Sequence, residues 1–155
     1  AGRSLEYVAD QFYAAGVAFG VYSSSFTDSQ FVAQVYDYVL ARGPDSSNPP
    51  PAADIKFWAD QLTAGTRSEG SLVLQMLSDV HTFFEDLPPT DPFYAFNFVA
   101  DLLNNKAAVA NYYAVELGLS MYTPAENIAF GADLVDLITP GDTSAAWALI
   151  GIDST

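Results

Sequence analysis

The chain contains one histidine, His81, whose side chain could take part in metal or acid–base chemistry. It could ligate haem, with Met76 or Met121 as the second axial ligand. It could also act as a general base oriented by Asp79 or Asp86. A haem-attachment motif needs cysteine, and the chain has none. We therefore expect His81 to be a structural residue at a helix end, where the helix dipole favours a positive charge.

Glu116 is the best candidate for a general acid, because it lies in the largely apolar run 112–117. Burial in such surroundings would raise the pKa of its carboxyl towards the range of a general acid. Glycoside hydrolysis needs a second carboxylate, and the sequence pairs none with Glu116. The same residue fits the solvated side of an amphipathic helix. We predict no catalytic residue, and a small glycan-cleaving enzyme with Glu116 as general acid stays the alternative.

Asp45 and Asp54 flank a loop, residues 46–53, that carries two serines and an asparagine. Carboxylate and amide oxygens are the ligands that calcium prefers. The sequence lacks the spacing of an EF-hand loop, and it lacks glycine-rich nonapeptide repeats. A solvated loop explains the same pattern. Calcium at Asp45 and Asp54 is therefore a hypothesis, and we predict no other cofactor.

Aromatic residues are abundant, with 11 Phe, 9 Tyr and 2 Trp. Most should form the core, but exposed rings could stack on sugars. Tyr36, Trp58 and Tyr94 are the candidate ligand-binding rings, although we expect Trp58 to serve mainly in core packing.

The composition excludes several classes of protein. The 155 residues include 19 Asp and Glu against 5 Lys and Arg, a net charge of −14, which would repel nucleic acid. Half of the residues are hydrophobic, which is typical of a folded chain. No run of eighteen apolar residues is free of charge, so we predict no transmembrane segment.

The elements that must position these residues are helices. Capping boxes begin at Thr27, Thr66 and Thr123, and Asp91 precedes a proline as at a helix start. No strand-like alternation of useful length is present. The pattern predicts an all-α fold, a compact bundle of seven or eight short helices. The expected helices cover about residues 4–18, 27–42, 52–64, 66–84, 91–103, 106–117, 123–140 and 142–150.

The first of these helices has apolar residues at helical spacing. We expect this face to point into the core. It consists of Leu5, Val8, Phe12, Ala15 and Phe19.

Two segments carry a family resemblance. Residues 31–45 read FVAQVYDYVLARGPD, and residues 58–68 read WADQLTAGTRS. They resemble the bacterial domain-of-unknown-function 4214 family, whose pattern is F-V-x-x-x-Y-x-x-V-L-x-R-x-P-D, a short loop, then W-x-x-Q-L-x-x-G-x-x-S. The likeness covers about residues 28–84, and the proline-containing loop 46–53 departs from the family's short glycine-containing turn. We predict a single domain, residues 1–155, with this core at 28–84 and a C-terminal helical sub-bundle at 91–155.

The resemblance implies a cellular setting. Members of the family are parts of large secreted bacterial proteins, namely calcium-repeat exoproteins, adhesins and S-layer proteins. It implies an extracellular or cell-surface location, with lipopolysaccharide, another surface glycan or neighbouring S-layer and adhesin domains as partners. The family has no established catalytic residues.

These observations lead to one functional hypothesis. The chain is expected to be a non-enzymatic module for cell-surface attachment or S-layer and adhesin assembly, binding a glycan with calcium as a bridging ion. The glycan-cleaving enzyme with Glu116 and an inert spacer domain remain the alternatives.

Overall fold

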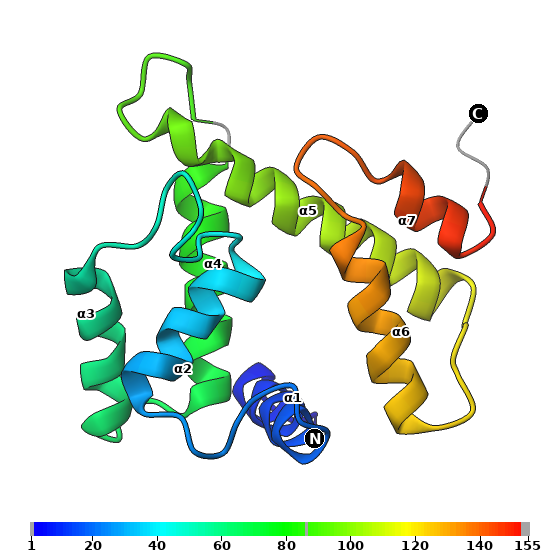
Figure 1. Ribbon diagram of the computed structural model, residues 1–155, viewed down its shortest axis with the longest axis horizontal. Helices are drawn as coiled ribbons and strands as arrows, with labels where there is room; N and C mark the ends of the chain where they lie inside the picture. The colour runs from blue at the N-terminus through cyan, green and yellow to red at the C-terminus, as the bar shows by residue number, and fades with distance from the viewer. Residues whose placement is uncertain (1, 86, 153–155) are drawn as a thin grey trace. The chain divides into compact units, whose positions relative to one another are not determined.

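The computed structural model describes residues 2–85 and 87–152, and these residues form helices and turns without a strand (Figure 1). The all-α prediction is confirmed, and the described residues contain seven α-helices. The α-helices are α1 (Leu5–Ala18), α2 (Asp28–Gln34), α3 (Ala52–Thr63), α4 (Glu69–Phe84), α5 (Asn97–Asn111), α6 (Pro124–Asp136) and α7 (Ser144–Leu149). Three short turns of other helix types add η1 (Val35–Val39), η2 (Tyr94–Phe96) and η3 (Tyr112–Glu116).

The chain divides into two compact units, residues 1–79 and residues 80–155. The boundary falls inside α4, which continues through it without a break. Within the described part of the chain, no helix is long and apolar enough to cross a bilayer.

In the first unit, α2 starts at a side-chain cap. Thr27 caps α2 through a capping box with Gln30, as predicted. The helix then widens into the π-helical turn η1, and it ends where Ala41 adopts a φ of 52°, a left-handed conformation that stops a helix. α2 packs alongside α3 (Figure 1).

The face of α1 that was predicted to point into the core is largely exposed to solvent. Leu5 and Phe12 are each 74% exposed, and Phe19 is 46% exposed. Val8 is also exposed, and Ala15 is half-buried.

The helix instead turns Gly16 and Tyr13 towards the rest of its unit. Gly16 is buried beside the Tyr22 ring, and Tyr13 packs against Tyr22 and Phe31 with centroid distances of 5.7 and 5.3 Å. The backbone of α1 also lies directly against Gly70 of α4. A contact of backbone with backbone requires the face with small residues, so the larger apolar side chains are left outside.

The second unit is built on α5. Leu102 and Val109 of α5 pack with Leu134 of α6 and Ala146 of α7 in one buried cluster. The sequence predicts a helix from 91 to 103 and another from 106, but α5 runs unbroken from Asn97 to Asn111. The break is absent because the Asn105 amide bonds to carbonyls far along the chain and does not compete with its own helix.

Candidate functional site

Tyr36, predicted as a ligand-binding ring, lies in the core of the first unit. It is only 5% exposed, so its faces are not available for stacking on a sugar. Its carbonyl accepts a hydrogen bond from the Arg42 backbone at 2.8 Å, and the Arg42 guanidinium lies over the Tyr36 ring, 5.5 Å from its centroid. The Arg42 Nε also donates to the Asn48 carbonyl at 3.0 Å. Arg42 therefore links the proline-containing loop, residues 46–53, to η1.

Trp58 and Asp54 lie close to this buried arginine. Burial raises the pKa of Tyr36, and the negative charge of Asp54 adds to the effect; a hydrogen bond with Trp58 and the charge of Arg42 oppose it. Burial lowers the pKa of Arg42, while Tyr36 and Asp54 act in the opposite direction. The structure thus brings three of the predicted residues together, with Trp58 half-buried among them. Their arrangement is that of a structural support for the loop.

The two acids of the calcium hypothesis are both exposed. The negative charge of Asp54 raises the pKa of both Arg42 and Tyr36, so Asp54 already interacts with groups of its own unit. No group of three or more histidine and acidic side chains in the described residues is placed to hold a metal ion. A calcium ion at Asp45 or Asp54 remains a prediction.

Tyr94 belongs to the other unit and is 42% exposed. It follows a turn that Asp91 fixes by accepting a hydrogen bond from the Phe93 backbone at 2.8 Å. The predicted helix start at Asp91 is wrong, since this turn and η2 precede α5. Tyr94 is the one candidate ring of the three that is openly accessible.

His81 lies in the last turn of α4, as expected. Its Nδ1 is 3.2 Å from a carboxylate oxygen of Glu85, and its Nε2 is 2.9 Å from the Asn104 side-chain oxygen. Both ring nitrogens are therefore engaged by neighbours in the fold. Of the two acids considered as its orienting partner, Asp79 accepts a hydrogen bond from Gln75, and Asp86 lies outside the described residues.

Glu116 is exposed at the end of η3. Of the two environments that the sequence left open for Glu116, the structure shows the solvated one. The physical reason for choosing Glu116 as a general acid is therefore missing.

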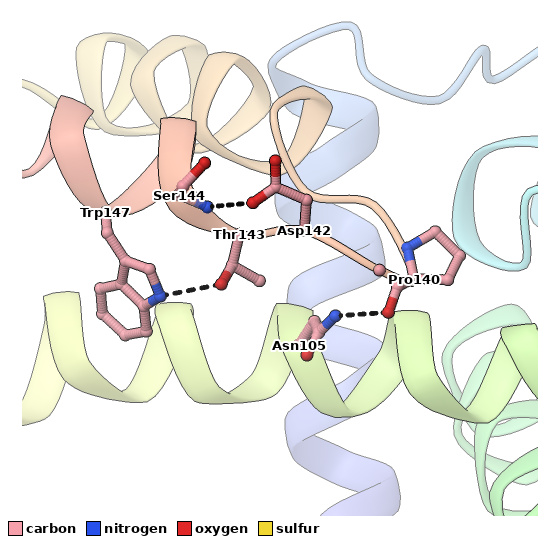
Figure 2. Close-up of a pocket in the computed structure, with 7 residues that line it drawn as sticks. Asn105, Pro140, Asp142, Thr143, Ser144 and Trp147 are labelled. Carbon is pink, nitrogen blue, oxygen red and sulfur yellow. Dashed lines mark hydrogen bonds between the residues drawn. The ribbon is translucent and has the colours of Figure 1, made fainter. Parts of the chain in front are cut away.

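A pocket that the sequence analysis did not identify lies in the second unit (Figure 2). Its volume is about 410 Å³. α5 supplies one wall, and the turn before α7 and the first residues of α7 supply the rest. The lining residues are Asn105, Pro140, Gly141, Asp142, Thr143, Ser144 and Trp147.

Hydrogen bonds fix the walls of this pocket. The Asn105 amide donates to the carbonyls of Thr139 and Pro140 at 2.9 and 3.0 Å, which ties the turn to α5 (Figure 2). The indole N–H of Trp147 donates to the Thr143 hydroxyl at 2.9 Å. The ring itself packs edge-on against Tyr112. The pocket is therefore held in shape before any ligand arrives.

Asp142 supplies the charge in the pocket. Its carboxylate accepts a hydrogen bond from the Ser144 backbone at 2.8 Å. Hydrogen bonds from the backbone and the hydroxyl of Ser144 lower the pKa of Asp142, so the group is ionised at neutral pH. An indole ring, an ionised carboxylate, hydroxyls and an amide surround one small space, a set suited to binding a neutral polyhydroxyl compound.

Only a short stretch of the sequence could have indicated this pocket. Pro140 and Gly141 mark a turn, and Asp142 and Trp147 follow it at the spacing of a helix start and its first turn. The partner across the pocket, Asn105, lies 35 residues before Pro140, and the sequence does not reveal that pairing.

Comparison with known proteins gives one family match. Residues 9–79 match the model described as "Domain of unknown function (DUF4214)". The matched segment includes Tyr36, Arg42 and Trp58, and it ends before the residues that line the pocket. No curated protein and no solved structure gives a significant match.

Proposed function

We propose that this chain, whose residues 9–79 form a domain of the DUF4214 family, is a non-enzymatic module that binds a surface glycan. The pocket around Asn105, Asp142 and Trp147 is the proposed binding site. The setting is the one that the family resemblance implies, a secreted bacterial protein whose helical module attaches to a cell surface or assembles an S-layer or adhesin. The observation that carries the proposal is that an aromatic ring and an ionised carboxylate are both among the residues that line one pocket.

The chemistry of the pocket favours a sugar over other small ligands. A sugar presents apolar C–H faces to an aromatic ring and hydroxyls to acceptors such as the Asp142 carboxylate. Asp142 is held by Ser144 and the turn is held by Asn105, so little conformational freedom is lost on binding. The ionised carboxylate disfavours an anion in the same place.

The net charge of the chain favours a neutral glycan over an anionic one. The chain carries a net charge of −14, so an anionic lipopolysaccharide core would be repelled at low salt. We propose that the pocket takes a neutral sugar unit and that calcium, as the candidate bridging ion, reduces the repulsion between the protein and an anionic surface. Asp45 and Asp54 are the acids to test for that ion.

The first experiment is co-sedimentation of the full chain with whole bacterial cells, with lipopolysaccharide and with a neutral polysaccharide, each with calcium and with a chelator. We expect pelleting with the glycan, stronger with calcium on the anionic surfaces. Absence of pelleting in every arm would contradict the proposal and favour an inert spacer.

A matched pair of variants assigns the binding to the pocket. Asp142→Asn removes the carboxylate but keeps an oxygen that can accept the hydrogen bond from Ser144, and we expect at least a fivefold loss of glycan binding. Asp133→Asn makes the same charge change at an exposed position of α6 outside the pocket and should bind as the unchanged chain does. Equal effects of the two variants would indicate general charge repulsion and contradict a site at Asp142.

Glu116→Gln tests the enzyme alternative. If the chain binds without cleaving, this variant should bind glycan unchanged, and reducing-end assays of both proteins should detect no product. Cleavage by the unchanged chain that Glu116→Gln abolishes would overturn the proposal.

A further inference from the structure

The segment between α4 and α5 contains the only Asp–Pro peptide bond of the sequence, Asp91–Pro92. Three hydrogen bonds fix Asp91. Its backbone N–H donates to the Pro88 carbonyl at 2.8 Å, and its own carbonyl accepts from the Tyr94 backbone at 3.1 Å. Its carboxylate accepts from the Phe93 backbone at 2.8 Å. The fold therefore holds both the carboxylate and the backbone carbonyl of Asp91 beside the bond to Pro92.

This arrangement favours attack of the Asp91 carboxylate on the carbonyl carbon of the same residue. The two groups belong to one residue, so closing a five-membered ring between them costs no translational freedom. The hydrogen bond from Phe93 restricts rotation of the side chain. The hydrogen bond from Tyr94 polarises the carbonyl, and it strengthens as negative charge develops on the carbonyl oxygen during attack.

Proline provides a good leaving group on the other side of the bond. Its nitrogen is a tertiary amide nitrogen without an N–H. Such a nitrogen takes up a proton more readily than the nitrogen of an ordinary peptide bond. Pro92 is exposed and Asp91 is half-buried, so solvent reaches the nitrogen that must be protonated.

We propose that the chain cleaves itself at the Asp91–Pro92 bond. A carboxylate oxygen of Asp91 forms a bond with the Asp91 carbonyl carbon, the bond from this carbon to the Pro92 nitrogen breaks, and the nitrogen takes up a proton from solvent. Water then opens the cyclic anhydride at Asp91 to two carboxyl groups, so the whole reaction consumes one water molecule. The products are residues 1–91, with the family domain, and residues 92–155, with the pocket. This reaction occurs once per chain and does not depend on glycan binding.

Mass spectrometry of the full chain tests the cleavage. The purified chain is incubated in a mildly acidic buffer, with and without urea, and fragments 1–91 and 92–155 are quantified over time. We expect the folded chain to release both fragments at least about tenfold faster than the unfolded chain, because only the fold holds the two reacting groups in place. An absence of fragments, or a rate in urea that equals or exceeds that of the folded chain, would overturn the proposal.

Two variants separate the roles of the carboxylate and the proline. Asp91→Ser keeps an oxygen that can accept the hydrogen bond from Phe93 but cannot form an anhydride, so this chain should stay intact. Pro92→Ala keeps the carboxylate but replaces the leaving group with an ordinary amide nitrogen, so most of the cleavage should be lost. Far-UV circular dichroism should show the same helix content in both variants. Cleavage of Asp91→Ser at the rate of the unchanged chain would contradict the mechanism.

The Asp142–Thr143 bond is a control within the same chain. The Asp142 carboxylate accepts from the Ser144 backbone at 2.8 Å, as the Asp91 carboxylate accepts from the residue two positions after it. The residue that follows Asp142 is not proline, so this bond should stay intact in the same sample. Cleavage at both aspartates at similar rates would refute a reaction specific to Asp91–Pro92.

Discussion

Gly70 is a position where one added methyl group should have a large and predictable effect. It lies in the first turn of α4, and a Cβ built there would be 2.5 Å from the Ala9 carbonyl carbon and 2.5 Å from the Asp10 nitrogen. These are backbone atoms, which cannot turn aside as the end of a flexible side chain can. Gly70→Ala must therefore push α1 away from α4.

The expected magnitude follows from two opposing effects. Alanine is the better helix former by about 1 kcal/mol, and near a helix end it gains less than that. Overpacking of a close contact costs about 1–3 kcal/mol. We expect the free energy of unfolding to fall by about 1–2 kcal/mol in Gly70→Ala, because the clash involves three backbone atoms of α1.

Gly131→Ala is the matched control, since it makes the same change inside α6. A Cβ at Gly131 would meet nothing within 4 Å, so only the helix propensity changes, and we expect a gain of about 0.5–1 kcal/mol. The same substitution is thus expected to have opposite signs at the two positions.

Urea unfolding followed by fluorescence can measure both variants, because each unit contains one tryptophan. In a Trp147→Phe background, Trp58 reports the unit that contains Gly70; in a Trp58→Phe background, Trp147 reports the unit that contains Gly131. A Gly70→Ala chain as stable as its parent, or more stable, would refute the close contact between α1 and α4.

Three further predictions concern other contacts. Arg42→Ala removes the hydrogen bond to the Asn48 carbonyl and should lower the free energy of unfolding by about 2 kcal/mol, measured by urea unfolding. Thr123→Ala removes the cap of α6 and should cost about 1 kcal/mol in the same assay. The pKa of Asp142 is lowered in the folded chain, so its stabilisation is complete above the pKa of the unfolded state and is lost as the pH falls through the folded pKa. A carboxyl titration by NMR should give Asp142 a midpoint below the ordinary value of an aspartate, and a midpoint at or above that value would contradict the hydrogen bonds from Ser144.

Helix starts could be predicted from the sequence where a cap is local. Thr27 and Thr123 form the predicted capping boxes, since each bond spans three residues and depends on little else. The box predicted at Thr66 is wrong. The Thr66 hydroxyl donates to the Gln61 carbonyl at the end of α3, and Ser68 accepts from the Ser71 backbone at the start of α4. Neighbouring candidates for one cap cannot be ranked without knowing where the preceding helix ends.

The faces of the helices were harder to predict. α1 has apolar residues on more than one side, and hydrophobic periodicity selects the side with the largest residues. The structure uses the side with Gly16 because α4 approaches the α1 backbone at Gly70. Tyr36 was predicted as a binding ring, yet it is buried, because its π-helical turn and Arg42 enclose it.

The candidate pocket is formed by residues that lie far apart in the sequence. Asp142, Ser144 and Trp147 are close in sequence, and the turn before them can be recognised. The pocket exists because Asn105 reaches Thr139 and Pro140, 34 and 35 residues away. A single sequence carries no sign of such a bond, so the pocket had to be seen in the structure.

The unbroken course of α4 determines how the molecule can be divided for study. The family match begins at residue 9, inside α1, and ends at residue 79, inside α4. A fragment cut at these two positions would lose the first turn of α1, with the Ser4 cap, and the final residues of α4, with His81 and its bonds to Glu85 and Asn104. Fragments for expression should therefore begin before Ser4 and keep the whole of α4.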